Sequence, residues 1–330
     1  MNYSLPFEKE NRKIISRYES KTSPDFGKNP KERTIKELLN LGFVNLDKYS
    51  GPTSHEVADI VKKVLKVKTC GHGGTLDPRV TGVLPIGLNK ATKILQVFLH
   101  GGKEYVCEMK IHQKVTKKEL MEAFKKFTGK IDQLPPIKSS VKREWREREI
   151  YYINLLEFED KTALFRVGCE AGTYIRKLCT DIGDYLKVKA HMQDLRRTQA
   201  SCFKEEDSVT IFDLQDAMTL FEEKKDESLL RKCIIPMEDA VSHLKKIYAS
   251  DGAISAITNG APLMLPGVVK MTDNIAKGNF VAIMSLKDEL VALGEALMSS
   301  KEMVKNSKGI AVSLKRVMMS PEVYKREPKK

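Results

Sequence analysis

The sequence predicts an α+β fold in which a main domain of helices and strands precedes a small β-barrel. Two observations support this prediction. Between residues 50 and 200, segments with apolar residues at helical spacing alternate with segments in which every second residue is apolar. From about residue 246, short apolar runs are separated by Gly and Pro turn signals, as in small barrels. The 330 residues also exceed the usual size of one compact domain.

The N-terminal part combines a polar segment with the start of the first clear helix. Residues 1–35 are polar and charge-rich, which predicts an extended or partly ordered arm. Thr53 and Glu56 form the T-x-x-E pattern of a capping box, so a helix should begin near Ser54. His55 falls in its first turn, where a packing or capping role is as open as a functional one.

The middle of the chain predicts two strands and a helix. Residues 102–111 alternate apolar and polar positions, which predicts a half-buried strand with Tyr105 facing inward. Residues 163–169 form another apolar run, and a turn leads from it to an amphipathic helix with Thr173 as its N-cap. Residues 204–245 are helix-prone and suit a connecting region.

The C-terminal part, residues 246–330, predicts the strands of the barrel. Residues 281–286 and 290–298 read as two strands joined by a short turn, and residues 309–319 as a further strand. Together with the main domain, residues 36–245, this gives a polar extension and two domains.

Charge and cysteine usage narrow the class of protein. Lys and Arg number 57 against 44 Asp and Glu, a formal net charge of +13. This favours a polyanionic partner such as nucleic acid, although a solvated basic surface is the alternative. The six cysteines form no C-x-x-C pair, which indicates reduced thiols and no zinc site. No apolar run is long enough to cross a membrane, so we expect a soluble cytoplasmic protein without membrane partners.

The stretch GHGGTLDPRVTGVLP, residues 71–85, surrounds Asp77 with glycines and prolines. Glycines permit positive φ and a close approach of substrate, and Pro78 disfavours helical backbone at Asp77. No G-K-[ST] follows, which excludes a P-loop. A catalytic carboxylate and an ordinary Asx-turn both fit this pattern.

Other residues offer chemistry with equally open alternatives. Arg176, in the first turn of the predicted helix, could hold a carboxylate ionised, bind phosphate or be solvated. Tyr105 could stack on a base or pack in the core. Basic residues gather in residues 141–149, around Trp145, and in residues 190–198, which suits an RNA partner or a salt-bridged surface.

Six motifs follow one another along the chain: GPTSHEV, GHGGTLDPRVTGVLP, GKEYV, PPIKSSVKR, GTYIRKL and AHMQDLRRT. In this order they resemble the TruB-type RNA pseudouridine synthases, and more closely the archaeal and eukaryotic dyskerin branch of that family. The resemblance implies a catalytic domain with a central mixed or antiparallel sheet flanked by helices. The segment NGAPLMLPGV with VALGEALM resembles a PUA domain, the RNA-binding barrel that grips the ACA end of the guide RNA in this branch.

The resemblance assigns roles to individual residues. Asp77 is the expected catalytic aspartate, Arg176 its partner, and Tyr105 the ring that stacks on the uracil and takes part in the final proton removal. The expected substrate-binding residues are Leu195, which lines the uracil pocket, His55 near the extruded nucleotide, Lys48 in a supporting role, and Arg197.

The implied reaction is isomerisation of uridine in RNA to pseudouridine, which requires no cofactor and no metal. Asp77 could attack C1′, add to C6 or remove a ribose proton; the sequence leaves these open. The implied partners are H/ACA guide RNA, rRNA, tRNA and the small H/ACA ribonucleoprotein proteins. The alternatives are a stand-alone enzyme for the TΨC-loop uridine of tRNA and a non-catalytic H/ACA RNA scaffold.

Overall fold

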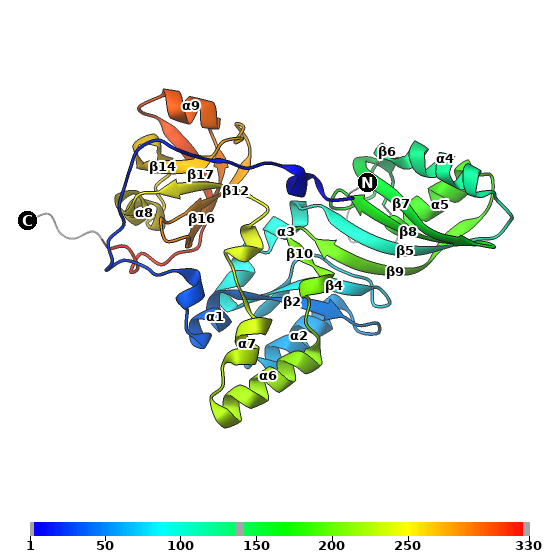
Figure 1. The fold of residues 1–330 in the computed structure, drawn as a ribbon, viewed down its shortest axis with the longest axis horizontal. Helices are drawn as coiled ribbons and strands as arrows, with labels where there is room; N and C mark the ends of the chain where they lie inside the picture. Colours follow the sequence, from blue (N-terminus) through cyan, green and yellow to red (C-terminus); the bar gives the residue numbers. More distant parts are fainter. Residues whose placement is uncertain (1–2, 136–141, 326–330) are drawn as a thin grey trace, which may run out of the picture. The chain divides into compact units, whose positions relative to one another are not determined.

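The chain forms two compact units in the computed structural model, which describes residues 3–135 and 142–325 (Figure 1). The first unit comprises residues 1–9, 44–87 and 95–233, and the second comprises residues 10–43, 88–94 and 234–330. In the described ranges, no helix is long and apolar enough to span a bilayer.

The first unit is built on a mixed sheet with the strand order β2-β4-β9-β5-β8-β7-β6. β4 and β9 run parallel, whereas β5 pairs antiparallel with both β9 and β8. β3 pairs with β4, and β10 with β9. The strands are β2 (Gly42–Lys48), β3 (Cys70–His72), β4 (Thr81–Leu88), β5 (Lys103–Ile111), β6 (Gly129–Gln133), β7 (Arg146–Glu159), β8 (Thr162–Cys169), β9 (Ala190–Ala200) and β10 (Phe203–Lys204).

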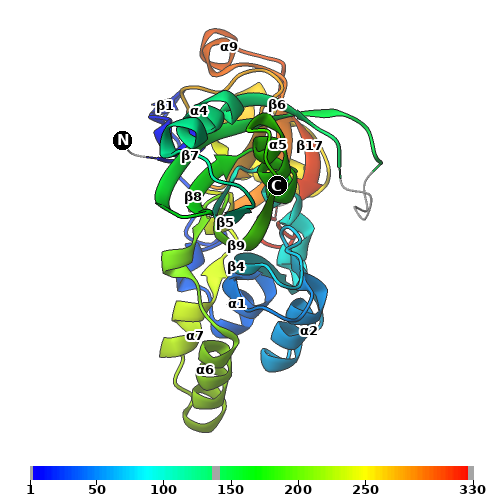
Figure 2. The ribbon, with the colours of Figure 1, turned by 90° about the vertical axis from the view of Figure 1, so that its right-hand side faces the viewer.

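Helices cover this sheet through their apolar faces. α5 packs on β9 and β5, and α4 lies beside α5 on the same part of the sheet (Figure 2). Cys179 of α5 and Cys107 of β5 meet in this core with their Sγ atoms 3.6 Å apart. The helices are α2 (Ser54–Val64), α3 (Gln96–His100), α4 (Lys117–Phe127), α5 (Ile175–Tyr185), α6 (Ile211–Lys224) and α7 (Ser228–Cys233), with 3-10 turns η1 (Pro6–Lys9) and η4 (Glu205–Asp207).

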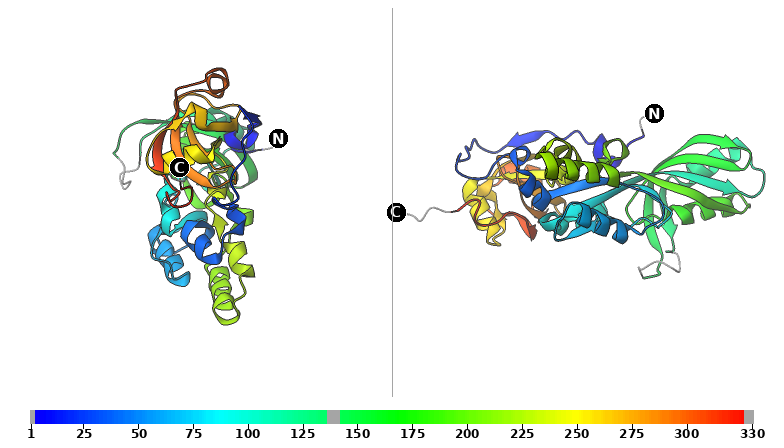
Figure 3. Two further views of the ribbon diagram at one scale, coloured as in Figure 1. Left: turned by 90° about the vertical axis from the view of Figure 1, so that its left-hand side faces the viewer. Right: turned by 90° about the horizontal axis from the view of Figure 1, so that it is seen from below.

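The second unit contains a seven-stranded sheet in the order β1-β14-β12-β15-β16-β17-β13 around its own apolar core. Residues 10–43 belong to it, and within them β1 pairs antiparallel with β14, beside the yellow and orange strands in Figure 3. The strands of this sheet are β1 (Ile14–Ser16), β12 (Lys245–Ala249), β13 (Leu263–Met264), β14 (Val268–Thr272), β15 (Phe280–Met284), β16 (Leu290–Ala296) and β17 (Ile310–Val317). The second unit also contains the short strand β11 (Ile235–Pro236) and the helices α1 (Ile35–Leu41), α8 (Asp251–Thr258) and α9 (Ser300–Lys305). Its 3-10 turns are η2 (Pro30–Glu32), η3 (Asn89–Ile94), η5 (Asp239–Val241) and η6 (Leu265–Gly267).

The predicted α+β class is confirmed, as is the first helix. Thr53 and Glu56 form both bonds of the capping box at the start of α2. The predicted N-cap of α5 is wrong. Tyr174 occupies that position, while the Thr173 hydroxyl donates to the Glu170 carbonyl at 2.7 Å. The expected extended arm includes a paired strand, β1.

Candidate active site

Asp77 lies on the loop between β3 and β4, and buried side chains hold this loop from below. Lys48, which is fully buried, donates from Nζ to the carbonyls of Tyr49, Pro78 and Val80 at 2.9, 2.9 and 3.0 Å. A backbone bond from Val80 N–H to the Asp77 carbonyl closes the turn at 3.0 Å. The turn therefore does not depend on the Asp77 carboxylate, which remains available for chemistry.

A second buried group fixes the residue before Asp77. The Ser54 hydroxyl accepts from Leu76 N–H at 2.8 Å and donates to the Leu76 carbonyl at 3.0 Å. Ser54 is 1% exposed at the first position of α2, so the GPTSHEV motif reaches the Asp77 loop directly.

Asp77 and Arg176, which the family resemblance expects to pair, are in contact in the structure. Arg176, in the first turn of α5, donates from Nη2 to Asp77 Oδ2 at 2.6 Å. The two side chains are 57% and 60% exposed, so the ion pair contributes at most about 1 kcal/mol to stability. The contact orients the Asp77 carboxylate toward the first turn of α5.

Tyr105 lies on β5 between Val167 of β8 and Arg197 of β9 and is 8% exposed. Burial raises the pKa of Tyr105, and the positive charge of Arg197, together with a hydrogen bond to it, partly opposes that rise. The side chain is therefore a neutral phenol near pH 7.

The Arg197 side chain is buried and holds the backbone of the Asp77 loop, and it is not a surface cation. It is 1% exposed and donates to the Val83 carbonyl at 2.7 Å and to the Gly74 carbonyl at 3.1 Å. Arg196 is also engaged, because it forms ion pairs with Asp47 and Glu205. These two arginines of residues 190–198 do not form the basic surface cluster that the sequence suggested.

Two glycines allow the loop to approach Arg197. Gly82 has φ +100°, and a Cβ there would lie 2.2 Å from the Arg197 carbonyl oxygen. Gly74, with φ +133°, places its carbonyl against the Arg197 guanidinium. Backbone of this kind is strongly biased toward glycine.

The remaining predicted residues differ in exposure. Leu195 is buried on β9, opposite Cys107 of β5. The side chain of His55 is 85% exposed on α2, with Asp59 at 3.9 Å. The motif PPIKSSVKR lies largely outside the described residues, since only positions 135, 142 and 143 fall within them.

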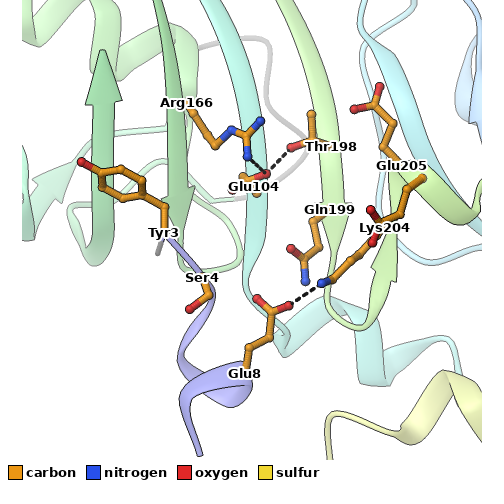
Figure 4. A pocket seen from close by; sticks show the side chains of 10 residues that line it. Tyr3, Ser4, Glu8, Glu104, Arg166, Thr198, Gln199, Lys204 and Glu205 are labelled. Carbon is orange, nitrogen blue, oxygen red and sulfur yellow. Dashed lines mark hydrogen bonds and ion pairs between the residues drawn. The ribbon is translucent and has the colours of Figure 1, made fainter. Parts of the chain in front are cut away.

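Sequence reasoning missed the groups that brace β5 behind Tyr105. Glu104, 6% exposed, accepts hydrogen bonds from Tyr152 Oη at 2.5 Å and Thr198 Oγ1 at 2.7 Å. Figure 4 shows Glu104 between Arg166 and Thr198 at one side of a cavity of about 500 Å³. Alternation places Glu104 on the opposite face of β5 from Tyr105. In the sequence, Glu104 is a charged residue at a position that alternation assigns to the solvent-facing side of the strand, so its burial could not be expected.

Lys103 is a further missed group, on the same face of β5 as Tyr105. Its Nζ donates to the carbonyls of Phe98 and Gly101, each at 2.9 Å. Burial, helped by the charge of Arg197, lowers the pKa of Lys103 to about 8. In the described ranges, no three His, Cys, Asp or Glu side chains come together as metal ligands.

Four family models match successive parts of the chain. They are the DKCLD (NUC011) domain at residues 2–58, the N-terminal domain of TruB family pseudouridylate synthase at 62–175, the C-terminal domain of tRNA pseudouridylate synthase B at 176–242, and the PUA domain at 245–318. The probable tRNA pseudouridine synthase B of Methanosarcina barkeri is 51% identical over 97% of this chain and 94% of that protein. The chain belongs to the TruB family of pseudouridine synthases.

Other relatives and solved structures agree with this membership. The probable tRNA pseudouridine synthase B of Methanothermobacter thermautotrophicus is 48% identical over 95% of this chain and 97% of that protein. The crystal structure of a Cbf5-Nop10-Gar1 complex contains a chain of 48% identity with TM-score 0.94, covering 98% of this chain and 99% of that one. An H/ACA RNP bound to a substrate RNA containing 2′-deoxyuridine gives 45% identity and TM-score 0.91, covering 98% and 99%. As a TruB family member, the protein is an isomerase.

Proposed function

We propose that Asp77 is the reacting group with which this TruB family member converts uridine in RNA to pseudouridine. In the reaction the C1′–N1 bond breaks, the uracil turns while held, and C5 bonds to C1′; C5 loses a proton and N1 gains one. The observation that carries the proposal is the 2.6 Å contact of Asp77 with Arg176 on a loop braced by Lys48, Ser54 and Arg197.

The carboxylate performs one of three first steps: attack at C1′, addition at C6, or removal of a ribose proton. Each requires an ionised Asp77, and the exposure of its side chain leaves it open to an incoming nucleotide. Tyr105 would contact the extruded base through its ring, a contact that contributes ~1–3 kcal/mol per base. This repays part of the few kcal/mol that extrusion costs.

Leu195 would line the uracil pocket and Arg197 would hold Tyr105 and the loop at Gly74. His55, exposed at the start of α2, would meet the extruded nucleotide. Lys48, being buried, acts through the Asp77 loop and not on the substrate.

The substrate RNA is presented, in this proposal, by an H/ACA guide RNA together with the small H/ACA proteins, and rRNA is the main target. Support comes from the solved relatives, whose complexes contain Nop10 and Gar1 in one case and H/ACA RNP with substrate RNA in another. Residues 36–245 would carry catalysis and residues 246–330 would hold the guide RNA. The six free cysteines suit a reducing compartment, and we place the protein in the cytoplasm.

Action on tRNA alone is the second candidate, favoured by the relatives' name, tRNA pseudouridine synthase B. Purified protein incubated with uridine-labelled tRNA transcript and with a guided rRNA fragment, with and without guide RNA and partner proteins, separates the two. Guided conversion that requires all components supports the proposal. Full conversion of tRNA by the protein alone, with no guided activity, would refute it. A scaffold without catalysis would convert neither substrate.

A further inference from the structure

Arg176 lies two residues after an N-cap that makes no side-chain capping bond. Helix α5 begins at Ile175, and its N-cap residue is Tyr174, whose phenol ring cannot cap the first turn. The exposed ion pair with Asp77 is too weak to fix where the helix starts. The position of the Arg176 guanidinium therefore depends on what holds the backbone of Tyr174.

Gln133, the last residue of β6, holds that backbone from both sides. Its Oε1 accepts from Tyr174 N–H at 2.9 Å and its Nε2 donates to the Tyr174 carbonyl at 3.1 Å. Gln133 is 1% exposed. The same carbonyl accepts the helical bond from Leu178 N–H at 3.0 Å, so the amide acts where the helix hydrogen bonds begin.

The paired bonds define orientation as well as distance. Turning the amide over would set Nε2 against the Tyr174 N–H and Oε1 against its carbonyl, losing both bonds. Ser54 plays the equivalent part for Leu76, one residue before Asp77, through two bonds to one backbone unit. Each residue of the ion pair is thus preceded by a backbone unit that a buried side chain holds with two hydrogen bonds: Leu76 by Ser54, and Tyr174 by Gln133.

We propose that Gln133 is a positioning residue for catalysis, which sets the first turn of α5 so that Arg176 meets Asp77. The inference rests on the proposed roles of Asp77 and Arg176. Gln133 lies 41 residues from Tyr174 in sequence, and its side-chain hydrogen bonds go to the Tyr174 backbone, not to Asp77 or Arg176. Its effect therefore belongs in the rate at saturating RNA and not in RNA affinity.

The test compares Gln133→Leu, which removes both bonds, and Gln133→Glu, which keeps the acceptor and loses the donor. Asn45→Leu is the control: Asn45 is also 1% exposed and donates to the Lys204 carbonyl at 2.7 Å, away from α5. The assay is single-turnover release of tritium from 5-tritiated uridine in RNA, for variants verified as folded. Gln133→Leu should slow turnover ~10–100-fold, as expected for a small misplacement, with RNA affinity within about threefold.

A second background separates positioning from general damage. When Gln133→Leu is added to the Arg176→Lys variant, the single-turnover rate should fall by less than about threefold further, because the group that Gln133 positions is already altered. An equal loss in both backgrounds, or an equal loss for Asn45→Leu, would overturn the inference. If Gln133→Leu fails to fold, Gln133→Glu carries the same comparison.

Hydrogen exchange distinguishes this inference from the proposed function. Peptides covering residues 172–180 should exchange faster in Gln133→Leu than in wild type, whatever the chemical role of Arg176. Unchanged exchange there would overturn the inference. If exchange quickens while Arg176→Lys retains full turnover, the proposed role of Arg176 fails and the catalytic part of the inference fails with it.

Discussion

Replacing Lys48 with methionine should loosen the Asp77 loop without removing any group that touches RNA. The ammonium group makes three hydrogen bonds of 2.9–3.0 Å to backbone carbonyls, two of them at Pro78 and Val80, on either side of Arg79. Methionine fills a similar volume and leaves these carbonyls without that donor. An unpaired buried polar group costs ~1–3 kcal/mol. The Val80 carbonyl makes the buried bond of the three, whereas the Pro78 carbonyl keeps the hydrogen bond from Gly51 N–H at 3.0 Å. We therefore expect the free energy of unfolding to fall by ~1–3 kcal/mol, with relief of the buried charge offsetting part of the loss.

The same change should slow chemistry, because a shift of about 1 Å in a reacting group costs ~100-fold. Urea unfolding followed by circular dichroism measures the stability, and single-turnover tritium release measures the rate. Lys66→Met is the matched control, because the Lys66 side chain is exposed and forms an ion pair with Glu222 at the surface. It should change stability by less than about 0.5 kcal/mol. Wild-type stability and rate in Lys48→Met would refute the proposed support of the loop.

Two further predictions concern Lys103 and Gly82. Burial lowers the pKa of Lys103 to about 8 in the folded protein, against about 10.4 in the unfolded chain. Between these two pH values the unfolded chain binds a proton that the folded protein does not. The contribution of Lys103 to the free energy of unfolding therefore rises with pH in this range. Wild type should therefore gain up to ~3 kcal/mol relative to Lys103→Met between pH 7 and 10.5 in urea titrations, and parallel curves would contradict this. Gly82→Ala should unfold at a clearly lower urea concentration than Gly129→Ala. Both glycines have φ near +100°, but only at Gly82 would an added Cβ lie 2.2 Å from a carbonyl oxygen. Equal urea midpoints would show that the clash relaxes.

Local sequence patterns predicted the elements that depend on neighbours in the chain. The Thr53 and Glu56 capping box marked the start of α2, and alternation placed Tyr105 on the inward face of β5. The N-cap of α5 was misplaced at Thr173 because that helix start is held by Gln133, a tertiary partner that no local pattern reveals.

The site followed from the sequence only through its ordered motifs. Spacing alone could not show that Asp77 and Arg176, which are 99 residues apart, come into contact. Burial of Arg197 and Lys48 was equally hidden, because charged side chains usually face solvent. Their partners are backbone carbonyls supplied by the fold, and any residue type can provide these.

The most direct test of the account is the replacement of Asp77 with asparagine, which keeps the size of the side chain and removes its negative charge. Because the ion pair with Arg176 is exposed, the melting temperature should change little. Pseudouridine formation in guided RNA should be abolished, while RNA binding stays within a few fold. Retained turnover in Asp77→Asn would contradict the assignment of Asp77 as the reacting group.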